Sequence, residues 1–227
     1  MTDRDATMAV FLDLENIALG ARDAKYPRFD VQKLLERVLL KGHIVVKKAY
    51  CDFKRYDEFK RGLHEAAFEL IEIPHVRQSG KNSADIRMVV DALDLCYTKG
   101  HVDTFVIVSG DSDFSPLVSK LRENDKLVIG VGVKQSTSDL LTSNCDEFIF
   151  YDDLVRTTEK QRQAQRKKAS QKAIEKSGAG EEDRKRQAAL DLLLATVEDL
   201  FEERGEEEKV WGSMVKQAIK RRQPGFS

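Results

Sequence analysis

The hydrophobic residues of the first 150 positions are grouped in short continuous runs, with amphipathic stretches between them. The runs lie at residues 8–14, 43–51, 68–73, 104–108, 127–133 and 147–151. Runs that do not alternate with polar residues are typical of strands whose two faces are both covered by helices. We therefore predict six short buried strands, with the run Thr-Phe-Val-Ile-Val at 104–108 near the centre of the sheet.

Between these runs, apolar residues recur at the spacing of three and four that is typical of helices. The pattern predicts one helix between Asp30 and Gly42, and further helices over 55–68, 84–98, 115–123 and 138–142. The connection from the first strand to Asp30, which contains Gly20 and Pro27, is predicted to be a loop. Strands and helices in regular succession predict an α/β fold with a mostly parallel sheet and right-handed crossovers.

The composition changes after about Asp153. Residues 156–187 contain almost no large apolar side chains, and Lys and Arg outnumber the acidic residues there. Such a segment is either a solvated, partly helical linker or a basic arm that follows an RNA backbone. From Ala188 on, two short amphipathic helices are predicted, and they are too small to bury Trp211 and Phe226 by themselves. We expect this tail to dock on the first domain, on a second copy of the chain or on another protein, or to be an incomplete domain.

The overall composition excludes several classes of protein. The net charge of the 227 residues is −1, so a nucleic-acid surface would have to be local. The three cysteines form no Cys-x-x-Cys pair and the four histidines are scattered, so no zinc site is expected. No window of the chain approaches a membrane span. We therefore expect a cytoplasmic protein that has no contact with membranes.

Two of the predicted strands run directly into acidic residues. The first strand leads to Asp13, with Glu15 close behind, and the strand at 104–108 leads to Asp111 and Asp113. In open α/β sheets, ligands bind at the carboxyl ends of the strands. Asp85 begins the helix that follows the Gly80-Lys81 loop and is expected at the same edge.

Carboxylates that are crowded together in this way require a compensating cation. At an effective dielectric near 20, two carboxylates about 4 Å apart repel each other by roughly 4 kcal/mol. Ligand sets made only of oxygen suit Mg²⁺ or Mn²⁺. The predicted catalytic and metal-binding residues are Asp13, Asp85, Asp111 and Asp113. The predicted supporting residues are Asn16 and Ser109, which would orient the carboxylates or a water, and Lys81 and Lys134, which would meet phosphate.

Each of these acidic residues also has a purely structural interpretation. Asp13 can cap the segment after the first strand, and Asp85 can stabilise the first turn of a helix through the helix dipole. Asp111 or Asp113 can serve as a turn residue beside Gly110. Glu15 and Asp91 are weaker candidates for the site.

Several ordered segments resemble the motif blocks of the NYN domain, a branch of the PIN-like nuclease superfamily. They are FLDLENI at 11–17, KNSADIRMVVDAL at 81–93, SGDSDFSPL at 109–117 and the segment 138–148. The resemblance covers residues 7–153 and implies a three-layer PIN-like (Rossmannoid) fold and metal-dependent cleavage of RNA. The acidic positions of the family correspond to the four aspartates named above. The first motif departs from the common Asp-Gly-x-Asn and reads Asp-Leu-Glu-Asn.

The tail resembles the start of a LOTUS (OST-HTH) domain, a winged-helix module associated with RNA. The matching segments are ALDLLLATVEDL at 189–200 and VWGSMVKQAIKRRQPGFS at 210–227. The sequence stops where that family continues into its wing, so we expect a shortened or degenerate module. The predicted organisation is a nuclease-like domain at 7–153, a charged linker at 154–187 and this partial module at 188–227.

The leading hypothesis is a metal-dependent ribonuclease that acts on single-stranded RNA and leaves a 5′-phosphate. One alternative is an RNA-binding or adaptor protein that retains the acidic pocket but leaves RNA uncut. Another is a phosphatase of the haloacid-dehalogenase type with Asp13 as nucleophile. That chemistry requires a phosphate-binding lysine ahead of the second acidic loop, and residues 100–110 contain no lysine.

Overall fold

The computed structural model describes residues 6–73, 83–157, 181–204, 209–223 and 225. The chain divides into two compact units. The first contains the residues up to Leu34 together with His43–Leu154, and the second contains Leu35–Gly42 and the chain from Val155 on. The candidate site belongs to the first unit.

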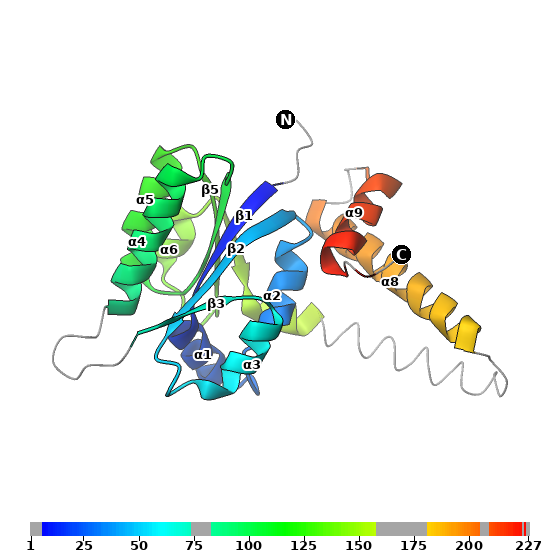
Figure 1. The fold of residues 1–227 in the computed structure, drawn as a ribbon, viewed down its shortest axis with the longest axis horizontal. Coiled ribbons are helices and arrows are strands. Elements are labelled where there is room, and N and C mark those ends of the chain that lie inside the picture. Colours follow the sequence, from blue (N-terminus) through cyan, green and yellow to red (C-terminus); the bar gives the residue numbers. More distant parts are fainter. Residues whose placement is uncertain (1–5, 74–82, 158–180, 205–208, 224, 226–227) are drawn as a thin grey trace. The chain divides into compact units, whose positions relative to one another are not determined.

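The first unit is built on a six-stranded parallel sheet with the strand order β3-β2-β1-β4-β5-β6 (Figure 1). The strands are β1 (Ala6–Asp13), β2 (Gly42–Cys51), β3 (Glu69–Glu72), β4 (Thr104–Val108), β5 (Leu127–Gly132) and β6 (Glu147–Phe150). The predicted α/β fold with a parallel sheet is therefore confirmed. The direction of winding reverses between β1 and β4. In open α/β sheets, ligands bind at the carboxyl ends of the strands at such a reversal.

Helices cover both faces of this sheet and produce three layers. They are α1 (Leu14–Asp23), α2 (Val31–Val38), α3 (Asp57–Glu65), α4 (Ser83–Thr98), α5 (Ser115–Glu123) and α6 (Asp139–Asn144). A 3₁₀ turn, η1 (Ser112–Phe114), precedes α5. In Figure 1, α4 and α5 lie on one side of the sheet, and α1 and α3 lie on the other.

The core between the sheet and α4 and α5 fixes the two central strands relative to each other. Ala9 and Phe11 of β1 and Phe105 and Ile107 of β4 are fully buried in it. The rings of Phe11 and Phe105 stack with their centroids 6.0 Å apart. Because full burial of a phenylalanine or isoleucine side chain contributes about 1.5–3 kcal/mol, this core stabilises the pairing of β1 and β4.

The segment after β1 forms a helix, so the predicted loop there is wrong. Helix α1 starts directly at Leu14, and the Asp13 side chain caps it by accepting the Asn16 N–H. Leu14, Ile17 and Ala21 are buried along one face. Gly20 lies inside the helix, at a point of close packing where a Cβ would lie 2.3 Å from Ser136 Oγ.

The second unit contains two helices of the tail, α8 (Glu181–Arg204) and α9 (Gly212–Arg222), so the predicted helical tail is confirmed. Its small core consists of Leu40, Leu200, Val215, Ala218 and Ile219. Arg222 Nη1 lies 2.7 Å from Asp199 Oδ2, and this ion pair joins α9 to α8. Residues 158–180 of the predicted linker, and Phe226 of the tail, lie outside the described residues.

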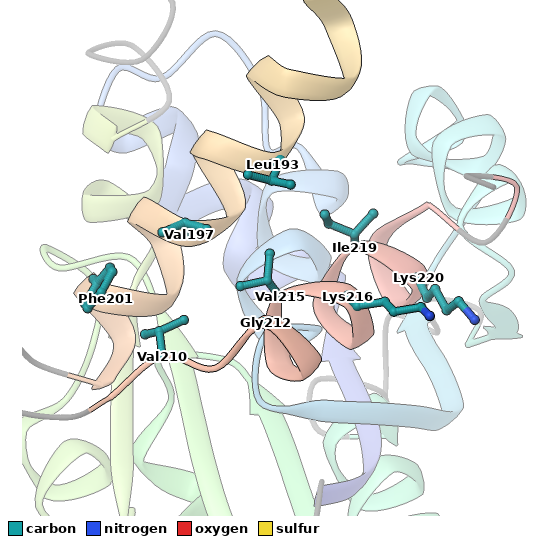
Figure 2. A pocket seen from close by; sticks show the side chains of 9 residues that line it. All are labelled: Leu193, Val197, Phe201, Val210, Gly212, Val215, Lys216, Ile219 and Lys220. Atoms are coloured by element: carbon teal, nitrogen blue, oxygen red, sulfur yellow. The ribbon is translucent and has the colours of Figure 1, made fainter. Parts of the chain in front are cut away.

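Helices α8 and α9 enclose an apolar groove of about 580 Å³ (Figure 2). Its lining is apolar apart from two lysines, and comprises Leu193, Val197, Phe201, Val210, Gly212, Val215, Lys216, Ile219 and Lys220. Trp211, at the start of α9, remains 60% exposed, as expected for a tail that is too small to bury it. None of the helices in the described part of the chain is long and apolar enough to cross a membrane.

Candidate functional site

Two of the predicted residues meet where β1 and β4 leave the sheet. Leu12 and Val108 are partners in the register of these strands, so Asp13 and Ser109 follow side by side. Ser109 Oγ donates a hydrogen bond to Asp13 Oδ2 at 3.0 Å. The other carboxylate oxygen of Asp13 accepts the Asn16 N–H at 3.2 Å. Both carboxylate oxygens of Asp13 are therefore held in place by hydrogen bonds.

One further hydrogen bond joins the first turn of α1 to the loop that follows β4, and another lies within that loop. The side-chain oxygen of Asn16 accepts the Gly110 N–H at 2.8 Å. The Asp111 N–H donates to Ser109 Oγ at 3.2 Å. Ser109 thus accepts a hydrogen bond from its own loop and donates one to Asp13. The position of the Asp13 carboxylate consequently depends on the first turn of α1 and on the loop after β4.

Asp13 is the most deeply buried carboxylate of the site, with 7% of the residue exposed. Its burial raises its pKa from 3.8 to about 7, even though the hydrogen bonds from Asn16 and Ser109 oppose the rise. The negative charges of Asp85 and Glu15 add to the increase. Without a cation, this carboxyl is therefore protonated in a large fraction of molecules at neutral pH.

Asp85 interacts electrostatically with acidic residues at the start of α1 and in the turn after β4. It lies half-buried in the first turn of α4, and burial raises its pKa. The charges of Asp111, Asp113 and Glu15 raise it further. Asp85 is therefore coupled both to Asp13 and Glu15 at the start of α1 and to Asp111 and Asp113 after β4. We call these four aspartates and Glu15 the acidic region.

Asp111 and Asp113 lie in the turn that follows β4. Asp111 Oδ1 accepts the Asp113 N–H at 2.9 Å and so caps η1, while Asp113 is exposed. Asp13 likewise caps α1. The structural interpretations of Asp13 and Asp111 therefore hold, but they do not preclude a second role, since a carboxylate offers about four lone-pair sites.

The donors of this region suit a hard divalent cation such as Mg²⁺ or Mn²⁺, because all of them are oxygen atoms. Among the described residues, no three His, Cys, Asp or Glu side chains are gathered as a complete metal-binding group. Mg²⁺ is commonly held by only one or two carboxylates and several waters. The burial and mutual repulsion of Asp13 and Asp85 fit such an ion, since its charge would offset both effects.

Of the two lysines predicted to contact phosphate, the structure describes only Lys134. Lys81 lies outside the described residues. Lys134 is exposed in the turn after β5, at the same edge of the sheet as Asp13 and Asp111. Its backbone N–H is bonded to Asp152 Oδ2 at 2.8 Å, so the turn is fixed while the side chain extends into solvent.

Asp91, a weaker candidate, joins helix α4 to β2. It accepts hydrogen bonds from the Tyr50 hydroxyl at 2.8 Å and from Arg87 Nε at 3.0 Å, and Lys48 Nζ lies 3.6 Å away. Burial raises the pKa of Asp91, but these hydrogen bonds and the Lys48 charge outweigh burial and leave the pKa below its usual value. Asp91 is therefore saturated by local partners that hold α4 against the sheet.

Glu15, a weaker candidate in the sequence, interacts electrostatically with two of the predicted site residues. Its charge raises the pKa of both Asp13 and Asp85. Its carboxylate pairs with Arg55, from the turn between β2 and α3, at 3.5 Å. Sequence reasoning did not identify Arg55 or the neighbouring Tyr56. Both were predicted to begin a helix over 55–68, whereas α3 begins at Asp57 and leaves them in the turn after β2, at the same end of the sheet as Asp13.

Comparisons with known proteins agree with this architecture. The chain is 28% identical over 120 residues to an uncharacterized protein of Methanocaldococcus jannaschii, an alignment that covers 53% of this chain and 47% of that protein. The chain thus spans about half the length of that curated relative. A crystal structure of a protein of unknown function from Vibrio parahaemolyticus is similar to 68% of this chain and 98% of its own, with 27% identity and a TM-score of 0.59. The NYN domain family matches residues 7–154, which is more than half of the chain, and the protein therefore belongs to the NYN domain family.

Proposed function

We propose that this protein is a metal-dependent ribonuclease whose active site is the acidic region at the ends of β1 and β4. One observation carries the proposal. Asp13 is buried and hydrogen-bonded at the switch point of the sheet, and its pKa is raised to about 7 with the charge of Asp85 contributing. A carboxylate in that setting gains its full charge when a cation compensates it. Membership of a nuclease-related family supports the same chemistry.

The side chains divide into those that would hold the ion and those that would orient them. Asp13, Asp85, Asp111 and Asp113 would hold one or two Mg²⁺ or Mn²⁺ ions. Such an ion supplies neutralisation of the phosphate charge and activation of a water nucleophile. Ser109 and Asn16 keep the Asp13 carboxylate in a fixed orientation. Lys134, exposed at the same edge, would contact phosphate.

We further propose that the substrate is single-stranded RNA and that the protein acts in the cytoplasm. The thiols of Cys51, Cys96 and Cys145 are free, which agrees with a reducing compartment. The tail, which resembles a partial LOTUS module, would help to hold RNA through its basic residues. On α9 the exposed basic residues are Lys216 and Lys220, whereas Arg221 donates to the Leu40 carbonyl and Arg222 pairs with Asp199.

The test compares RNA cleavage by the wild type and by Asp111→Asn, using a labelled single-stranded RNA with Mn²⁺, with Mg²⁺ or with a chelator. Wild type should cut the RNA only with metal, and Asp111→Asn should lower kcat/KM by about 100-fold or more. Asp125→Asn is the matched control. It changes an exposed aspartate just before β5, at the amino ends of the strands and away from the acidic region. The φ of 57° at this position is well tolerated by asparagine.

Intact RNA with wild type under every metal condition would contradict the enzymatic proposal. If the same protein binds the RNA with a steep salt dependence, the non-catalytic adaptor interpretation holds instead. Turnover of p-nitrophenyl phosphate through a trapped aspartyl-phosphate at Asp13 would favour the phosphatase alternative.

A further inference from the structure

A positively charged and aromatic surface lies directly beside the acidic region. Arg55 and Tyr56 are neighbours in the turn between β2 and α3, and this turn leaves the same edge of the sheet as Asp13. The Arg55 guanidinium carbon lies 5.8 Å from the centroid of the Tyr56 ring. Arg55 Nη1 lies 3.5 Å from Glu15 Oε1. The turn thus places a cation and an aromatic ring next to a residue of the acidic region.

The ion pair between Arg55 and Glu15 is of the kind that a ligand readily replaces. Its N–O distance of 3.5 Å is long, and the two side chains are 49% and 39% exposed. Half-exposed pairs of this type contribute little to stability. A phosphate group can replace Glu15, because the planar guanidinium can donate two parallel hydrogen bonds to phosphate oxygens in place of this long contact.

Tyr56 has the properties of a base-stacking platform. Its ring is half-buried and packs on Phe59, with the ring centroids 6.4 Å apart. Phe59 is only 8% exposed, and the guanidinium of Arg28 lies 4.7 Å from its ring centroid. Burial and the Glu15 charge raise the pKa of Tyr56 to about 12, so the phenol stays neutral at physiological pH. The Tyr56 ring therefore packs against Phe59 and remains partly exposed to solvent.

Glu15 links this surface to the acidic region, because it lies two residues after Asp13 and its Oε1 lies 3.5 Å from Arg55 Nη1. The charge of Glu15 raises the pKa of Asp13, Asp85 and Tyr56 alike. Arg22 of α1 acts on Tyr56 as well and lowers its pKa, so a second arginine lies near the ring. Arg22 is 74% exposed. Arg55 and Tyr56 therefore border the acidic region at the carboxyl ends of the strands.

We propose that Arg55 and Tyr56 form a nucleotide-binding subsite in which Arg55 takes the phosphate and Tyr56 stacks on the base of a nucleotide flanking the cleaved linkage. This inference rests on the proposed function and specifies how the substrate is recognised. A base can stack on Tyr56 only if it is unpaired, so the subsite selects single strands over duplexes. Stacking tolerates every base, and the selection is for strandedness rather than sequence.

The experiment measures binding of a fluorescent single-stranded RNA of about ten nucleotides by anisotropy, over a series of KCl concentrations. All proteins carry Asp111→Asn, so that the RNA stays intact. Adding Arg55→Gln should reduce the magnitude of the slope of log Kd against log[KCl] by about 0.7, as expected when one phosphate contact of a single strand is lost. Adding Tyr56→Ala should weaken binding about tenfold with little change in that slope.

Conservative and control variants separate recognition from folding. Arg55→Lys should keep the salt slope, and Tyr56→Phe should keep the affinity, since charge and ring are the features used. Arg122→Gln is the matched control, because Arg122 is 47% exposed and paired with Asp146 at 3.0 Å, at the opposite edge of the sheet. It should leave the slope unchanged.

A slope for Arg55→Gln equal to that of Arg122→Gln would overturn the phosphate contact. Unchanged affinity of Tyr56→Ala, or equal affinity of the parent protein for duplex and single strand, would overturn the stacking role. If wild type cleaves RNA and these results are still obtained, the subsite alone is wrong. If wild type neither cleaves nor binds RNA, the proposed function is wrong together with the subsite.

Discussion

At the scale of single residues, the surroundings of Asp13 have opposing effects on its pKa. Its hydrogen bonds from Ser109 and Asn16 favour the carboxylate, whereas burial and the charges of Asp85 and Glu15 favour the neutral acid. Burial prevails, and the pKa is raised to about 7. The folded state therefore favours the protonated acid over the free carboxylate when no cation is bound.

Asp13→Asn should make the metal-free protein more stable at pH 8. A carboxyl whose pKa is higher in the folded state than its ordinary value binds more protons there, so stability falls as pH rises from about 4 through 7. The rise from 3.8 to about 7 corresponds to about 4 kcal/mol, at 1.36 kcal/mol per pH unit. Urea unfolding of both proteins in a chelator, at pH 8 and at pH 4, measures the difference.

The stability advantage of Asp13→Asn should disappear near pH 4, where the wild-type acid is protonated and neutral in the folded state. Added Mg²⁺ at pH 8 should stabilise the wild type more than the variant, because the ion compensates the ionised carboxylate. A difference that is the same at both pH values would show that Asp13 titrates normally.

At the scale of elements, the site depends on close contact between the loops that follow β4 and β5. Ser138 N–H donates to the Gly110 carbonyl at 2.9 Å. A Cβ on Gly110 would lie 2.5 Å from the backbone oxygen of Ser136. Only glycine allows this approach, and the approach positions the Gly110 N–H that Asn16 accepts.

Gly110→Ala should therefore lower both stability and RNA cleavage. The added methyl group meets backbone rather than a flexible side chain, so one of the two loops must shift, at a cost of about 1–3 kcal/mol. Gly62→Ala on α3 is the control, because nothing lies within 4 Å of a Cβ built there. Thermal unfolding and cleavage assays of both variants measure the effect, and equal behaviour would contradict the role of the contact.

At the scale of the whole molecule, the two units differ in the size of their cores. The cluster between the sheet and α4 and α5 contains fifteen buried side chains among the described residues, whereas the cluster of the second unit contains five. Leu193 and Phe201, which line the groove between α8 and α9 (Figure 2), are 43% and 44% exposed. A protein partner or a second copy at these helices stays a prediction.

Hydrogen exchange should reflect this difference. Amides of α8 and α9 should exchange faster than those of β1 and β4, because opening the smaller core exposes less apolar surface. Ile219→Ala should accelerate exchange in α8 and α9 and leave β1 nearly unchanged, since truncating a buried isoleucine costs about 2–5 kcal/mol locally. Equal acceleration in β1 would show that the two units open together.

The sequence by itself determined the strands and most of the helices. β4 and α5 agree with the predicted bounds residue for residue, because each is a strongly patterned run with clear ends at Ser109 and Asn124. The α/β class followed from the order of these runs. Helix α1 was missed because Gly20 and Pro27 read as loop signals, although Leu14, Ile17 and Ala21 have helical spacing.

Only the tertiary structure decided which residues the acidic side chains contact and how deeply they are buried. The sequence proposed Asp13 and Ser109 as members of one site, but their hydrogen bond exists because β1 and β4 are neighbours although more than ninety residues separate them. The raised pKa of Asp13 likewise depends on burial that no local pattern encodes. The pairing of Glu15 with Arg55, and the packing of Tyr56 on Phe59, arise where separate turns meet at one edge of the sheet. Local pattern fixes which elements form, and long-range packing fixes which side chains meet.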